Sequence, residues 1–170
     1  MKLLATGLVV LSLLAGDAQA ADTRTKKTAP TNAFLISNIS DETDWCITAP
    51  EKNYDFASVR FQPCDFDGKP KNQLWSLDES GKLHSALDYD KCMIVDHGTD
   101  IYDGVRIKLA PCGLHTSLNR FTHSGGSSKL HVLVNNAYCI TNQGTRANAG
   151  DTIHAKPCQE QSSHAFTFRT

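Results

Sequence analysis

The segment VRFQPCDFDGKPKNQLW, residues 59–75, decides the fold of this 170-residue chain. Apolar and polar residues alternate up to Pro63, which is the pattern of a short β-strand with one buried face. Cys64 follows the proline, and residues 65–70 contain the Asp, Gly and Pro that are typical of a turn. The segment therefore predicts a strand and a turn that lead to Trp75, a large aromatic candidate for the core.

The features of this segment recur twice along the chain. All six cysteines fit a pattern that repeats with a period of about 47 residues. In each unit β-forming residues follow the first cysteine, a proline precedes the second, and an aromatic residue comes later, two places after a polar one. A fixed period of this length indicates a repeated supersecondary unit. The matching residues are Cys46, Cys64 and Trp75, then Cys92, Cys112 and Phe121, then Cys139, Cys158 and Phe166.

The repeats predict an all-β fold. No segment keeps a helical period for more than two turns, and each unit contains about four short alternating segments separated by turn residues. Three such units, at about 33–80, 81–127 and 128–170, cannot each bury an apolar face alone, so they must share one core in a closed threefold arrangement. We expect Trp75, Phe121 and Phe166 to fill that core near the threefold axis.

The N-terminus predicts export. Residues 1–20 have a short positive start, an apolar run and a small-x-small site at Ala18-Gln19-Ala20, as in a secretory signal peptide. The mature chain would start near Ala21, with residues 21–32 as a polar disordered leader. No segment is long enough for a permanent transmembrane helix. An even number of cysteines after a signal peptide is typical of a disulfide framework in a secreted protein.

Composition argues against several classes of function. The formal net charge is −1 without a basic cluster, which disfavours nucleic acid as a partner. No two cysteines stand two to four residues apart, so zinc is not expected. Motifs of serine hydrolases and zinc proteases are absent from the sequence. We therefore expect no catalysis, no cofactor and no metal.

The order of cysteine, strand, Pro-Cys and Gln-x-Trp resembles the ricin B-type β-trefoil, or Gln-x-Trp lectin family, over roughly residues 33–170. Asn72-Gln73-Leu74-Trp75 matches the family signature, whereas Phe121 and Phe166 replace tryptophan in the other repeats. Spacing alone leaves many cysteine pairings open. The resemblance implies one disulfide inside each repeat: Cys46–Cys64, Cys92–Cys112 and Cys139–Cys158.

The resemblance also implies where a sugar would bind, and here the chain departs from the family. Sugar-binding members have an Asp two residues after the first cysteine, a polar residue and an aromatic on the second strand, and an Asn before the Gln. The Asp positions hold Thr48, Ile94 and Thr141; the polar positions hold Arg60, Lys108 and His154; the aromatic positions hold Gln62, Ala110 and Lys156; the Asn positions hold Asn72, Leu118 and Ser163.

The first repeat keeps the best candidates for sugar contacts, Thr48, Arg60, Gln62 and Asn72, and Arg60 would favour an anionic sugar. A surface patch without a ligand is the alternative interpretation. Two weaker sets are Asp96, which would replace the missing carboxylate of the second repeat, and the third-repeat residues Thr141, Asn142 and His154.

Two functions remain open at this point. The first is a secreted lectin-like module that binds glycans without catalysis. The second is a protein-interaction module that binds a co-secreted protein, because the same fold occurs without sugar pockets in the targeting subunits of cytolethal distending toxins and in some protease inhibitors.

Overall fold

The computed structural model describes residues 32–40, 43–52, 54–96, 100–114, 118–123, 128–144, 146–159 and 165–170. The signal peptide expected at 1–20 and all but the last residue of the leader expected at 21–32 lie outside these ranges. Within the part of the chain that is described, no helix is long and apolar enough to cross a membrane.

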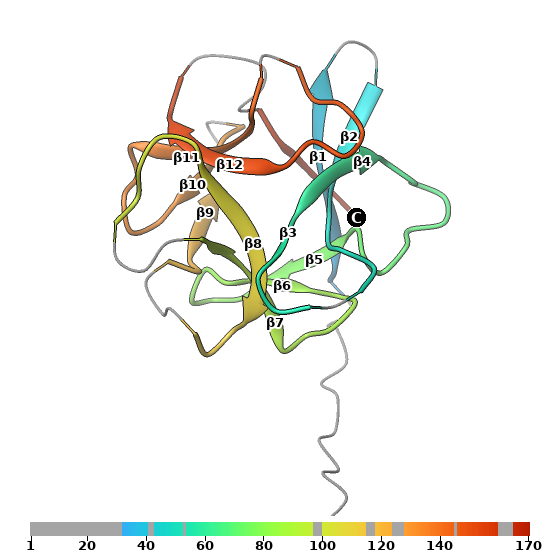
Figure 1. The fold of residues 1–170 in the computed structure, drawn as a ribbon. Coiled ribbons are helices and arrows are strands. Elements are labelled where there is room, and N and C mark those ends of the chain that lie inside the picture. The colour runs from blue at the N-terminus through green and yellow to red at the C-terminus, as the bar shows by residue number, and fades with distance from the viewer. Residues whose placement is uncertain are drawn as a thin grey trace, which may run out of the picture.

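The described residues form strands and turns, as the alternating pattern predicts (Figure 1). The strands are β1 Phe34–Ser40, β2 Thr43–Thr48, β3 Ala57–Ser58, β4 Arg60–Pro63, β5 Leu74–Leu77, β6 Leu83–Ser85, β7 Lys91–Val95, β8 Val105–Pro111, β9 Phe121–His123, β10 Leu130–Val132, β11 Tyr138–Asn142, β12 Ile153–Pro157 and β13 Thr167–Arg169. The all-β fold with repeated four-stranded units is confirmed. β3 and β4 together occupy the position of one strand of the first repeat, and this strand is interrupted at Val59.

The three repeats have the same strand register. The first strand of each repeat places one residue opposite the first cysteine: Ser37 in β1, His84 in β6 and His131 in β10. Strands of one repeat also pair with the next, since β3 pairs with β8, and β8 pairs with β12. The N-terminal strand β1 pairs with the C-terminal strand β13, which closes the arrangement. In Figure 1, β3, β8 and β12 surround the centre of the molecule on three sides.

One core is shared by all three repeats. Trp75, Phe121 and Phe166 are at most 2 % exposed, which confirms their predicted packing role. The Trp75 indole also donates its Nε1–H to the carbonyl oxygen of Ile47 at 2.8 Å, so its polar atom is satisfied inside the core. The core contains Ile36, Ile47, Val59, Phe61 and Trp75 from the first repeat, Leu83, Met93, Val105, Ile107 and Phe121 from the second, and Leu130, Ile140, Ile153, Ala155 and Phe166 from the third.

The disulfides lie within the repeats, as the family resemblance implies. They join Cys46 to Cys64, Cys92 to Cys112 and Cys139 to Cys158, with Cα–Cα distances of 4.9, 4.8 and 5.0 Å. In every repeat the first cysteine is fully buried and the second is half-buried. The amide of each second cysteine also donates a backbone hydrogen bond to the segment before the first cysteine. Each disulfide thus connects a core strand to a turn at the surface.

The glutamine of the Gln-x-Trp signature fixes that turn. Gln73 Nε2 donates to the carbonyl oxygen of Pro63 at 2.9 Å, and its Oε1 accepts from the amide of Asp65 at 3.0 Å. In the second repeat Asn119 makes a similar contact, donating to the carbonyl oxygen of Cys112 at 2.9 Å. These amide side chains satisfy backbone groups that a turn would otherwise leave unpaired.

We expect Trp75→Ala to lower the free energy of unfolding by about 3 to 5 kcal/mol, because it empties a fully buried site and leaves the Ile47 carbonyl without its donor. Urea denaturation followed by circular dichroism measures the loss. Trp75→Phe should cost less, since phenylalanine fills the equivalent position in the other two repeats. Equal losses for both variants would contradict this account.

Candidate functional site

A cavity of about 560 Å³ opens on the first repeat, where β2 and β4 meet the turn before β5. Four of its lining residues are those that the sequence predicts as sugar contacts in this repeat: Thr48, Arg60, Gln62 and Asn72. Its volume falls in the range of small-molecule sites. The structure therefore brings the four first-repeat candidates together around one space.

Strand register explains how β4 presents two of these residues. Thr48 ends β2 directly opposite Arg60, and Cys46 lies opposite Gln62. Arg60 and Gln62 are two residues apart on one strand, so their side chains lie on the same face. Phe61 between them points the other way and is fully buried in the core.

The turn before β5 supplies the third side of the cavity. The carbonyl oxygen of Asn72 accepts a hydrogen bond from the amide of Ala49 at 2.7 Å, which holds the turn against the end of β2. Gln73 also lines the cavity while its amide bonds to Pro63 and Asp65. The Asn72 position is therefore fixed by backbone contacts, and its side-chain amide offers both donors and an acceptor.

The polar groups of the cavity differ in how far they are already engaged. Arg60 is exposed, and its Nη1 donates to the carbonyl oxygen of Gly150 in the third repeat at 2.6 Å. A guanidinium has five N–H donors, so this one bond orients the side chain without using its full capacity. Thr48 is only 7 % exposed and donates its Oγ1–H to the carbonyl oxygen of Cys46 at 3.0 Å.

Sequence reasoning missed several residues of this cavity. Glu51 and Ser58 add a carboxylate and a hydroxyl, and Pro50 and Pro70 add apolar surface. They lie outside the positions that the cysteine register aligns, so the repeat pattern gave no signal for them. None of the described residues that line the cavity is aromatic, in agreement with Gln62 at the family's stacking position.

In the second repeat, Asp96 is engaged by a neighbouring cation. Lys108 Nζ lies 2.6 Å from Asp96 Oδ2, and both side chains are largely covered. Ile94 pairs with Lys108 across β7 and β8. A role for Asp96 in sugar binding stays a prediction, and it would require the carboxylate to exchange Lys108 for a ligand.

The third-repeat candidates are buried. Thr141 and Asn142 are each 1 % exposed and His154 is 4 % exposed. His154 already has a partner at each ring nitrogen: the carbonyl oxygen of Gly104 and the hydroxyl of Thr152, each at 2.7 Å. The three residues lie close to one another at the β11–β12 pairing, and their role as sugar contacts stays a prediction.

Comparison with known proteins decides the family. The profile of the ricin-type β-trefoil lectin domain matches residues 34–166 of the chain. This chain belongs to the ricin-type β-trefoil lectin family. No curated protein matches it by sequence.

Solved structures support the trefoil fold of this family member. The C-terminal half of an earthworm R-type lectin, in complex with GalNAc, is similar with a TM-score of 0.65 and 15 % identity, over 81 % of this chain and 97 % of that one. The β-trefoil lectin of the Vibrio vulnificus hemolysin/cytolysin, with N-acetyl-D-lactosamine bound, gives a TM-score of 0.61 and 19 % identity, over 81 % and 93 %. ThreeFoil, a designed threefold-symmetric protein, gives a TM-score of 0.68 and 12 % identity, over 81 % and 98 %.

Among the residues that the structure describes, two histidines lie beside disulfides, an arrangement that sequence spacing did not reveal. His84 lies beside Cys92–Cys112, and His131 beside Cys139–Cys158, with the ligand-type atoms of each group within 4.8 Å of one another. Such a spacing would suit a metal ion if the sulfurs were thiolates. Both sulfurs of each group are instead joined in a disulfide.

Asp78 is paired with the first of these histidines. Its Oδ2 lies 2.9 Å from His84 Nε2. Burial by itself raises the pKa of the Asp78 carboxyl, but the hydrogen bonds from His84, the Lys82 amide and Ser80, with the charge of His84, lower it from 3.8 to about 2.

The lowered pKa of Asp78 predicts an acid-sensitive part of the stability. A carboxyl that is more acidic when folded stabilises the fold above its unfolded pKa, and this stabilisation is lost as the pH falls from about 4 to about 2. Urea unfolding across that range should show a smaller decline for Asp78→Asn than for the wild type. Parallel declines in the two proteins would refute the assignment.

Proposed function

We propose that this protein is a secreted carbohydrate-binding module that recognises cell-surface or extracellular glycans through its first-repeat cavity, without catalysis. The observation that carries the proposal is the convergence of Thr48, Arg60, Gln62 and Asn72 on one cavity. The family match supports it, as do the earthworm and Vibrio lectins of the same fold, which were solved with GalNAc and N-acetyl-D-lactosamine.

The chemistry of the cavity suits hydroxyl groups. Asn72 and Gln62 each offer an amide that donates and accepts, and Glu51 offers a carboxylate, so neighbouring sugar hydroxyls would be bound in pairs. The rings of Pro50 and Pro70 would face the C–H side of the sugar in place of the usual aromatic ring. Arg60 would add a charge-assisted contact to an acidic sugar.

A single cavity of this type binds weakly, so useful affinity would come from several sites on a surface. Two more polar sets, Asp96 in the second repeat and Thr141, Asn142 and His154 in the third, remain candidates for further contacts. We expect the first-repeat cavity to contribute most of the glycan affinity, because its side chains line open space.

Variants of the cavity test this proposal on a glycan array, with the protein displayed in multivalent form. Arg60→Ala and Asn72→Ala should each weaken binding of the glycan that the wild type binds most tightly by roughly tenfold. Each substitution removes polar side-chain contacts to the sugar. Arg106→Ala is the matched control, because Arg106 is an exposed arginine on β8 outside the cavity. Equal binding by all three variants would reject this cavity as the site.

A protein-interaction module is the second candidate function. Tyr54 and Phe56 are 63 % and 42 % exposed on one loop, and Phe56 has a φ of 62°, which bulky residues rarely adopt. Exposed aromatics held in this way are typical of contact surfaces. The Vibrio trefoil, part of a hemolysin/cytolysin, shows the fold in a toxin. No binding to any glycan, together with capture of a co-secreted protein that Tyr54→Ser abolishes, would replace the lectin proposal with this one.

Export is part of the proposal and rests on the sequence of residues 1–20. N-terminal sequencing of the protein recovered outside the producing cell should begin near Ala21. Recovery of a chain that still starts at Met1 would contradict cleavage at this site.

A further inference from the structure

The three disulfides of this chain have different neighbours at one equivalent position. Ser37 lies opposite Cys46, His84 opposite Cys92, and His131 opposite Cys139. The backbone register is the same in all three repeats. The chain therefore contains three disulfides at equivalent positions with different facing side chains.

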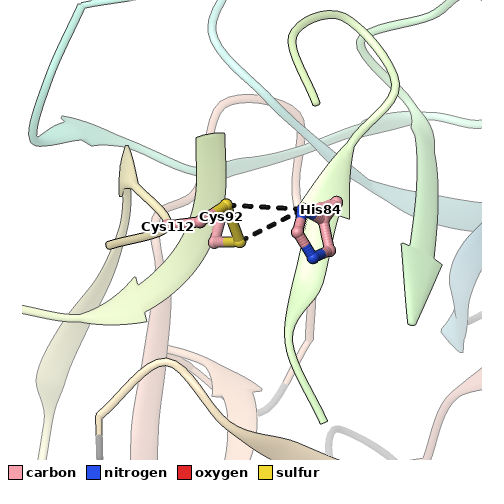
Figure 2. Close-up of side chains that lie close together, drawn as sticks. All are labelled: His84, Cys92 and Cys112. Carbon is pink, nitrogen blue, oxygen red and sulfur yellow. Dashed lines mark hydrogen bonds between the residues drawn. A yellow bond between two sulfur atoms is a disulfide. The ribbon is translucent and has the colours of Figure 1, made fainter. Parts of the chain in front are cut away.

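His84 is in direct contact with its disulfide (Figure 2). Its Nδ1 lies 3.5 Å from Cys92 Sγ and 3.4 Å from Cys112 Sγ. His84 is only 8 % exposed, and its ring stacks on Tyr89 with the ring centroids 4.2 Å apart. One imidazole nitrogen is thus held within 3.5 Å of both sulfur atoms.

The partners of His84 favour a ring that carries both N–H groups. Nε2 faces the Asp78 carboxylate at 2.9 Å, and Nδ1 faces the carbonyl oxygen of Tyr89 at 2.9 Å. Neither acceptor has a proton to give, so both bonds form only when each nitrogen is a donor. The lowered pKa of Asp78 is consistent with this pairing.

Other charged groups surround the same disulfide. Lys82, just before β6, donates from Nζ to the carbonyl oxygen of Cys112 at 3.3 Å. The segment between β6 and β7 that contains Tyr89 also contains Asp88 and Asp90. Lys82 thus places a positive charge on the backbone of Cys112.

Access to the disulfide is asymmetric. Cys92 is fully buried, whereas Cys112 is half-buried beside the exposed Gly113 and Leu114. Because Cys112 is the more exposed residue of the pair, we take its Sγ as the atom that a nucleophile from solvent attacks. Cys92 Sγ, 3.5 Å from His84 Nδ1, is then the leaving sulfur.

We propose that Cys92–Cys112 is a thiol-exchange site that takes low-molecular-weight thiols of the glutathione type. The thiolate attacks Cys112 Sγ and forms a mixed disulfide, while the Cys92–Cys112 bond breaks and its electron pair leaves on Cys92 Sγ. The attacking thiol is oxidised and Cys92 is reduced, so the step needs no other oxidant. The His84 N–H stabilises the Cys92 thiolate and can supply its proton, and a more stable leaving thiolate departs faster.

The groups described beside the other two disulfides differ from those beside Cys92–Cys112. Ser37 stands at the first, where no cation can form. His131 Nδ1 lies 3.6 Å from each sulfur of the third, and in the sequence Gly125 stands six residues before His131, where Asp78 stands before His84. These two disulfides are therefore internal references for the second.

The test is partial reduction of the folded full chain with glutathione. Samples are quenched by alkylation, then fully reduced, labelled with a second alkylating agent and mapped by mass spectrometry, which follows each disulfide separately. We expect Cys92–Cys112 to open about tenfold faster than Cys46–Cys64, with glutathione attached at Cys112. Equal rates for these two disulfides, or glutathione attached at Cys92, would overturn the proposal.

Variants separate the histidine from a general change in folding. His84→Gln keeps a hydrogen-bonding side chain without the cation, and it should slow only Cys92–Cys112, to near the rate of Cys46–Cys64. Asp78→Asn should have a smaller effect in the same direction. The matched control His131→Gln should leave Cys92–Cys112 unchanged. If His84→Gln does not slow the opening of Cys92–Cys112, the proposal is wrong. If His84→Gln instead speeds the opening of all three disulfides, the variant has lost its fold. The Asp78→Asn variant then provides the test, and an unchanged rate of Cys92–Cys112 opening in that variant would overturn the proposal.

Discussion

Apolar side chains from three repeats meet in one buried cluster, and the rest of the structure depends on that shared burial. A hairpin of short strands has too little apolar surface to be stable alone. Here each repeat contributes an equivalent set, from Ile36 to Trp75, from Leu83 to Phe121, and from Leu130 to Phe166. Because no repeat can bury its set by itself, the strands β3, β8 and β12 pair across repeat boundaries.

The covalent and polar contacts at the periphery follow from this core. Each disulfide joins a fully buried cysteine to a half-buried one, so it connects the core to a surface turn in the same way three times. Gln73 and Asn119 then satisfy the backbone of that turn. The cavity of the first repeat is formed by the same elements, which means that the positions of Arg60 and Asn72 depend on contacts made for stability.

Symmetry of the core leaves the surface free to diverge. Equivalent positions on β4, β8 and β12, opposite Thr48, Ile94 and Thr141, hold Arg60, Lys108 and His154. Their surroundings differ accordingly: Arg60 borders an open cavity, Lys108 pairs with Asp96, and His154 is buried against Gly104. The position facing each disulfide has diverged as well, from Ser37 to His84 and His131. Equivalent backbones thus support different chemistry.

The sequence by itself determined the all-β repeat, the core aromatics and, through the family resemblance, the three disulfides. These depend on residue type and spacing, because a strand alternates its faces and a fixed period aligns equivalent positions. It also named the first-repeat set Thr48, Arg60, Gln62 and Asn72. Only the tertiary structure decided that these four border one cavity with Glu51, since a loop position has no periodic signal. The contact of His84 with a disulfide was likewise decided by the pairing of β6 with β7, which brings together residues that sequence spacing does not relate.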